Sequence, residues 1–145
     1  MIRKALFVGA VIAAAIVLAA ELPLVQPKDL AGQLAAKGSS PPIFYVGPNV
    51  LYRSKHIPGS VFAGPGAKAE GLDELKRAVA KLPRDRQLVL YCGCCPWDRC
   101  PNVKPAVAAM QEMGFTHVKV LYLETSFAKD WIDAGYPVEA GTPRP

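Results

Sequence analysis

The stretch that decides the fold is 88-LVLYC-92, and the loop 93-GCCPWDRC-100 follows it directly. A continuous apolar run of this length is typical of a central strand in a parallel sheet, buried on both faces. All four cysteines of the 145-residue chain lie within residues 92–100. The strand therefore ends on Cys92, at the carboxyl edge where sheets of α/β domains hold their ligand sites.

Helical and strand-like patterns alternate on both sides of this run. We expect further strands over residues 43–46, 61–63 and 118–123, and helices over residues 28–38, 72–82, 101–114 and 126–135. This alternation predicts an α/β domain of three layers, with a central, mostly parallel sheet flanked by helices. Residues 21–27 are interpreted as a linker, 64–71 as a mobile loop rich in Gly and Pro, and 140–145 as a flexible tail.

The first 20 residues have a different character from the rest of the chain. Arg3 and Lys4 precede the unbroken apolar run 5-ALFVGAVIAAAIVLAA-20. This pattern is typical of a signal peptide, and an uncleaved N-terminal membrane anchor is the alternative. Both predict an exported domain, either periplasmic or anchored to the inner membrane and facing the periplasm.

Composition narrows the classes of partner. The formal net charge is +5, and 51% of the residues are hydrophobic, enough for a core. The basic residues are scattered and form no cluster interleaved with aromatic residues, which argues against nucleic-acid binding. Membrane contact is expected only through residues 1–20, if that segment is not cleaved.

The position of Cys92 suits a nucleophile. The thiolate is the reactive form of cysteine, and the partial positive charge at a helix N-terminus favours it. Loop N–H groups that point inward can also hold an anion. The same order of strand, cysteine, loop and helix occurs in thioredoxin-like enzymes and tyrosine phosphatases, so this order alone does not select one chemistry.

Four segments together make the chain resemble the rhodanese-like domain family. They are 26-QPKDLAGQL-34 with 43-IFYV-46, the turn 56-HIPGS-60, the strand 88-LVLYC-92, and 113-MGFTHVKVL-121 with 131-WIDAGYPV-138. The resemblance implies a single rhodanese-like domain over residues 28–139. It also implies sulfurtransferase chemistry through a persulfide on Cys92, the family's catalytic position.

The resemblance implies a small sulfur-containing donor, such as thiosulfate, a polysulfide or a persulfide. The acceptor would be thiophilic: cyanide, a small thiol or a thiol on a protein. No cofactor and no metal are expected. The active-site loop comprises Gly93, Cys94, Cys95, Pro96, Trp97, Asp98, Arg99 and Cys100. Within it, Arg99 is the candidate for holding an anionic donor.

Three features depart from the family pattern. The usual Asp-x-Arg after the first strand is replaced by 46-VGP-48, and the Gly pair before the last helix by 124-ETS-126. The loop after Cys92 is longer than usual, and Pro96 removes one N–H from any anion cradle. The resemblance therefore does not carry a thiosulfate pocket over to this chain.

The extra cysteines leave alternatives open. Cys94, Cys95 or Cys100 could resolve or accept the persulfide. Cys92 and Cys95 could instead form the C-x-x-C pair of a thiol–disulfide oxidoreductase. The cysteines could also bind zinc or copper(I), bind a partner without catalysis, or form a disulfide that braces the loop.

Other side chains are assigned structural roles. We expect Trp97 to pack the loop onto the domain, and Asp98 to cap the following helix. His56 should be a hydrogen-bonded structural residue, His117 a surface residue and Trp131 part of the core.

Overall fold

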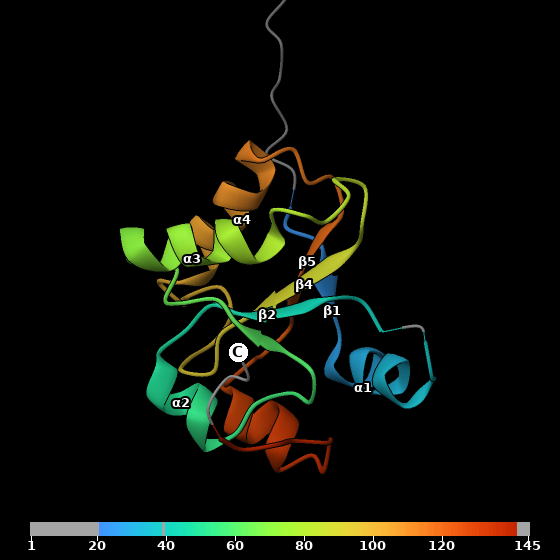
Figure 1. Cartoon of the computed structure of the whole chain (residues 1–145). Helices are drawn as coiled ribbons and strands as arrows, with labels where there is room; N and C mark the ends of the chain where they lie inside the picture. The colour runs from blue at the N-terminus through green and yellow to red at the C-terminus, as the bar shows by residue number, and fades with distance from the viewer. Residues whose placement is uncertain (1–20, 39, 142–145) are drawn as a thin grey trace, which may run out of the picture.

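The computed structural model describes residues 21–38 and 40–141 and forms a five-stranded parallel sheet (Figure 1). Its strands are β1 (Leu24–Val25), β2 (Ile43–Tyr45), β3 (Val61–Phe62), β4 (Leu88–Tyr91) and β5 (Val118–Leu121). Their order across the sheet is β1-β5-β4-β2-β3, so β4 is central. The predicted α/β architecture with a central parallel sheet is confirmed.

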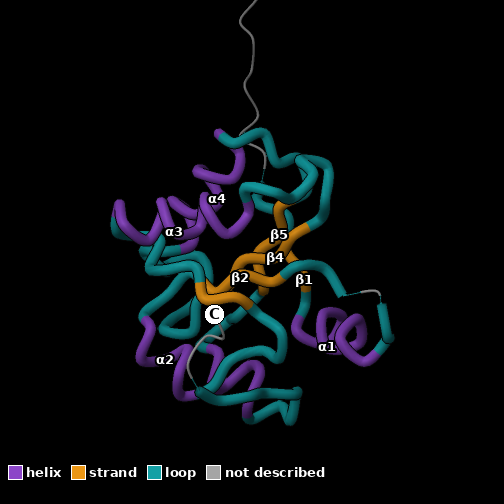
Figure 2. The backbone as a smooth tube through the Cα atoms, in the orientation of Figure 1, coloured by secondary structure: helices purple, strands orange, loops and turns teal. Residues whose placement is uncertain are grey.

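Helices cover both faces of the sheet (Figures 1 and 2). In these views α3 (Ala69–Val79) and α4 (Val103–Glu112) lie on one side of it. On the other side lie α1 (Pro27–Ala35), α2 (Asn49–Ser54) and the π-helical segment Ala128–Ile132. The domain therefore has the three layers that the sequence predicted.

Alternation along β4 separates two hydrophobic cores. Leu88 and Leu90 belong to the core that contains α3 and α4 residues, together with Cys92. Val89 and Tyr91 belong to the second core, which includes Leu30 of α1 and Trp131. Because strand side chains alternate between the two faces, every second residue of β4 enters the same core. The side chain of Cys92 is thus directed to the α3/α4 face.

Proline and glycine mark the ends of two helices. Pro27 occupies the first turn of α1, where its missing N–H breaks no intrahelical bond. Pro105 lies in the first turn of α4 for the same reason. Gly114 follows α4 with a φ of 88°, a left-handed conformation in which glycine is not strained.

Several local predictions were wrong. The segment interpreted as a linker contains β1, whose Leu24 pairs with Val120 of β5. The short helix α2 was not predicted. In the glycine-rich segment 64–71, Gly64, Gly66 and Gly71 are buried, and α3 begins at Ala69. These segments are too short or too irregular for periodicity to reveal them.

The last predicted helix is a π-helical turn. The N–H of Asp133 donates to the carbonyl of Ala128 at 2.9 Å, a bond that spans five residues. After it, the chain returns to the His-Ile-Pro-Gly turn, where His56 and Glu139 form an antiparallel bridge. The C-terminal segment therefore packs against the turn that the sequence singled out.

The predicted signal or anchor, residues 1–20, lies outside the described residues, as do residues 142–145 of the predicted tail. Within the described part of the chain, no helix has the length and apolar character needed to span a bilayer. Gly141, inside the predicted tail, donates a backbone hydrogen bond to the carbonyl of Arg53 at 2.9 Å.

Candidate active site

Cys92 follows the last residue of β4 and begins the cysteine loop. Its side chain is buried, with 3% of its surface exposed. Next to it the backbone pairing of the sheet continues, because the N–H of Val46 donates to the carbonyl of Tyr91 at 2.8 Å. Cys92 is therefore held at the end of the central strand, and a regular element of this kind positions a reactive group precisely.

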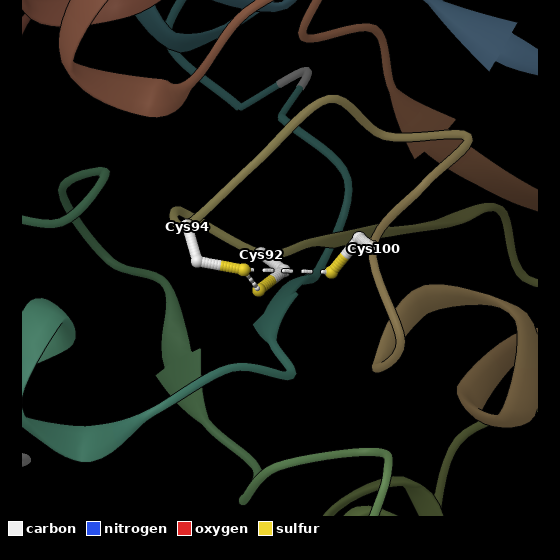
Figure 3. Close-up of side chains that lie close together, drawn as sticks. All are labelled: Cys92, Cys94 and Cys100. Atoms are coloured by element: carbon white, nitrogen blue, oxygen red, sulfur yellow. Dashed lines mark hydrogen bonds between the residues drawn. The ribbon is translucent and has the colours of Figure 1, made fainter.

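The loop brings three sulfur atoms together (Figure 3). The Sγ atoms of Cys92, Cys94 and Cys100 all lie within 4.8 Å of one another. Cys94 Sγ lies 3.4 Å from Cys92 Sγ and 3.9 Å from Cys100 Sγ. We call these three residues the thiol triad. Cys95 lies outside it but close by, with its Sγ 2.6 Å from that of Cys94.

Asn102 faces the triad from the start of α4, and the sequence analysis assigned it no role. Its side-chain amide donates to Cys92 Sγ at 3.5 Å and to Cys100 Sγ at 3.9 Å. Its Oδ1 accepts a hydrogen bond from the N–H of Ala67 at 3.0 Å, which fixes the amide with its donors toward the sulfurs. The only sequence signal was an asparagine near the start of the helix predicted over residues 101–114, where asparagine is equally typical of a cap.

Gly47 lines the side of Cys92 that faces β2. A Cβ atom at this position would lie 2.6 Å from Cys92 Sγ and 2.8 Å from Tyr45 Oη. The absence of a side chain therefore allows Cys92 and Tyr45 to approach the backbone after β2. This gives a physical reason for one departure from the family pattern, since residues 46-VGP-48 stand where the Asp-x-Arg is usual.

The two buried thiols of the triad have opposite electrostatic environments. A hydrogen bond with Cys92 lowers the pKa of Cys100 to about 5, and the backbone N–H of Asn102 contributes to this lowering. The same hydrogen bond with Cys100, followed by burial, raises the pKa of Cys92. Of the two neighbouring thiols, Cys100 therefore takes the negative charge more readily than Cys92.

Two neighbouring groups stay neutral for a different reason. Burial, followed by the hydrogen bond with Cys94, raises the pKa of Cys95 to about 12. Burial, followed by the charge on Cys92, raises the pKa of Tyr45. The Tyr45 hydroxyl donates to the carbonyl of Pro48 at 3.2 Å.

The rest of the loop is anchored mainly through its backbone. The backbone N–H of Trp97 donates to the carbonyl of Leu123 at 3.0 Å. Its side chain packs against the α3/α4 core, as expected. Arg99 is exposed, and among the described residues its guanidinium forms no hydrogen bond or ion pair with a cysteine. The capping role predicted for Asp98 is wrong, because the N-cap residue of α4 is Asn102.

The other structural assignments are confirmed. His56 is buried, with its Nδ1 2.7 Å from the carbonyl oxygen of Tyr52 and its Nε2 3.3 Å from Glu139 Oε1. Trp131 is fully buried and donates its ring N–H to the carbonyl of Pro137 at 2.9 Å. His117 is exposed.

Together these features define a parallel α/β domain with a thiol site at the carboxyl end of its central strand. The model of the rhodanese-like domain matches residues 26–131. The chain belongs to the rhodanese-like domain family, a family of sulfurtransferase type. A search of curated proteins finds no match.

Solved structures share the fold. A rhodanese-like domain from Anabaena sp. is 23% identical, with a TM-score of 0.60, over 83% of this chain and 80% of that one. A protein from Bacillus halodurans is 20% identical, with a TM-score of 0.63, over 83% of this chain and 79% of that one. Thiosulfate sulfurtransferase from Pseudomonas aeruginosa is 20% identical, with a TM-score of 0.62, over 85% of this chain but 21% of that one.

Proposed function

We propose that this protein is a sulfurtransferase that carries sulfane sulfur as a persulfide on Cys92. The observation that carries the proposal is the position of Cys92 at the carboxyl end of β4, in a rhodanese-like domain, at the start of the loop that leads to α4. A nucleophile at this position is presented by the sheet and lies close to the N-terminal end of a helix.

The first half-reaction loads the sulfur. Cys92 attacks the sulfane sulfur of a donor such as thiosulfate or a polysulfide, and its proton passes to the neighbouring Cys100. A bond forms between Cys92 Sγ and the sulfane sulfur. The bond between that sulfur and the rest of the donor breaks, and the leaving group, sulfite in the case of thiosulfate, takes the electron pair. The Asn102 amide, 3.5 Å from Cys92 Sγ, supports the negative charge at this sulfur.

The second half-reaction unloads the sulfur. A thiol acceptor attacks the outer sulfur of the persulfide, and Cys92 leaves as the thiolate. Cys94 is the nearest internal acceptor, because its Sγ lies 3.4 Å from Cys92 Sγ and the residue is exposed. Transfer from buried Cys92 to exposed Cys94 moves the sulfur to the surface, where cyanide, a small thiol or a protein thiol could take it.

The geometry gives less support to an oxidoreductase that uses the Cys92–Cys95 pair. Cys95 lies outside the group of sulfurs within 4.8 Å of one another, and its close contact is with Cys94. A disulfide needs its two sulfurs about 2 Å apart. Cys92 is placed for exchange with Cys94 rather than with Cys95.

Export is part of the proposal. Its support is the order of Arg3 and Lys4 followed by the apolar run over residues 5–20. Fractionation of cells that express the full chain, followed by mass measurement of the recovered protein, would show the compartment and whether the segment is removed. Recovery of the full-length protein from the soluble cytoplasm would contradict export.

The sulfurtransferase proposal is tested by thiocyanate release from cyanide with thiosulfate or a polysulfide as donor. We expect the wild type to be active, Cys92→Ser to be inactive, and Cys94→Ser to transfer sulfur more slowly. Mass spectrometry of the unreduced wild type should show one additional sulfur on Cys92 after exposure to the donor. Equal activity of the wild type and Cys92→Ser would overturn the assignment of the nucleophile.

A further inference from the structure

The thiol triad has the dimensions of a three-coordinate metal site. A metal ion bonded to three sulfurs in one plane, at about 2.3 Å from each, requires the sulfurs to lie about 4.0 Å apart. In the triad two separations are 3.4 and 3.9 Å, and all three are within 4.8 Å. The two printed separations are thus within about 0.6 Å of the value that such an ion requires.

The donor atoms select the class of metal. Among the described residues, the group of ligand atoms at this place consists of the three sulfurs alone, with no imidazole or carboxylate. Thiolate ligands favour Cu(I), whereas carboxylate and carbonyl oxygens suit Mg²⁺ and Ca²⁺. Structural Zn²⁺ sites are almost always tetrahedral and take four protein ligands. Cys95 Sγ lies 2.6 Å from Cys94 Sγ but outside this group, and a group of three sulfurs favours a monovalent, thiophilic ion over Zn²⁺.

The surroundings of the triad suit a site that is held firmly and is still open to exchange. Cys92 is held by the end of β4, and Cys100 lies just before α4; both are buried, with 3% of their surface exposed. Cys94 is exposed, so an ion could reach the triad from its side. The Asn102 amide donates to two of the three sulfurs, and such outer hydrogen bonds orient metal ligands.

From these observations we propose that Cys92, Cys94 and Cys100 form a binding site for one Cu(I) ion, with Cys95 outside the coordination. This differs from the expectation of no metal, and from the sequence alternative in which all four cysteines act as ligands. Cu(I) in this site would occupy Cys92. Metal binding and sulfur transfer are therefore mutually exclusive states of the same loop.

The test uses the full chain, reduced, freed of sulfane sulfur with cyanide, and desalted under anaerobic conditions. Cu(I) is then titrated in the presence of a chromophoric Cu(I) chelator that competes for it. We expect one equivalent of Cu(I) to be retained by the wild type, and X-ray absorption at the copper edge to count three sulfur neighbours. Zn²⁺ offered in the same way should be retained less well.

Two neighbouring substitutions provide the control. Cys94→Ser and Cys95→Ser make the same chemical change, one residue apart, at the outer part of the loop. Cys94→Ser should lose Cu(I) to the chelator, whereas Cys95→Ser should retain it as the wild type does. Circular dichroism of both variants checks that each is folded.

Three results would overturn the proposal: no retention by the wild type, equal loss in both variants, or Zn²⁺ held more tightly than Cu(I). None of these measurements depends on persulfide formation. A protein that fails to bind Cu(I) could still transfer sulfur, and an inactive protein could still bind the ion.

Discussion

Gly47→Ala tests whether the close approach of the backbone after β2 positions Cys92. The new Cβ would lie 2.6 Å from Cys92 Sγ, while an ordinary contact begins at 3.4 Å. The sulfur or the backbone must therefore shift by about 0.8 Å, the difference between these two distances. Tyr45 Oη, 2.8 Å from the same Cβ, limits movement in the other direction. Overpacking of this kind typically costs about 1–3 kcal/mol of stability.

The effect on activity should be similar in free energy to the effect on folding, because a 10- to 100-fold loss of rate corresponds to about 1.4–2.7 kcal/mol. A displacement near 1 Å at a reacting centre can cost about 10²-fold in rate. We therefore expect thiocyanate release by Gly47→Ala to fall by about 10- to 100-fold. The urea midpoint should fall by an amount that corresponds to a loss of about 1–3 kcal/mol in the free energy of unfolding, and the protein should still be folded at 25 °C.

Gly32→Ala is the matched control. It makes the same change in α1, where a Cβ would meet nothing within 4 Å. We expect unchanged activity. The free energy of unfolding should rise by about 0.4–1 kcal/mol, because alanine favours the helix and restricts the unfolded chain. Wild-type activity in Gly47→Ala would refute the reasoning, because it would show that the position of Cys92 does not depend on this contact.

Three further predictions follow from the site and its surroundings. Because the hydrogen bond with Cys92 lowers the pKa of Cys100 to about 5, the alkylation rate of Cys100 in the reduced protein, followed by peptide mass spectrometry, should rise with pH through about 5; a first rise near pH 9, as in an ordinary thiol, would contradict the lowered pKa. Asn102→Asp keeps an acceptor for the N–H of Ala67 but replaces the amide donor with a negative charge. Alkylation at pH 7 should therefore be slower than in wild type. An unchanged rate would show that the Asn102 amide does not support the thiolate. His56→Ala removes a buried ring that bonds Tyr52 and Glu139 and should lower the free energy of unfolding by about 1–3 kcal/mol in urea titrations, whereas His117→Ala, on the surface, should change it by less than about 0.5 kcal/mol.

Sequence reasoning placed Cys92 correctly because its signal is local. The apolar run 88-LVLYC-92 is long enough to indicate a buried strand, and the loop comes directly after it. Trp131 and His56 were also assigned correctly. The residue type indicates burial for a large aromatic side chain, and the recognisable turn indicates a structural role for the histidine. The errors lie where the local signal is weak: two residues of β1, six of α2, and the capping role of Asp98.

The sequence by itself determined the alternation of strands and helices, the delivery of Cys92 to a strand end, and the concentration of four cysteines in one loop. These depend on periodicity and on neighbours along the chain. Only the tertiary structure distinguished the cysteines from one another. Which sulfurs meet depends on how the loop turns between β4 and α4, and four thiols within nine residues can be arranged in several ways.

The tertiary structure also brings residues from separate segments of the chain to the thiol site. Asn102 is oriented by Ala67, and Gly47 contacts Cys92 across two adjacent strands. Such contacts arise from sheet order and helix packing, which no local pattern encodes. For the same reason the opposite pKa shifts of Cys92 and Cys100 became visible only in three dimensions, since an electrostatic interaction depends on distance in space rather than on separation along the chain.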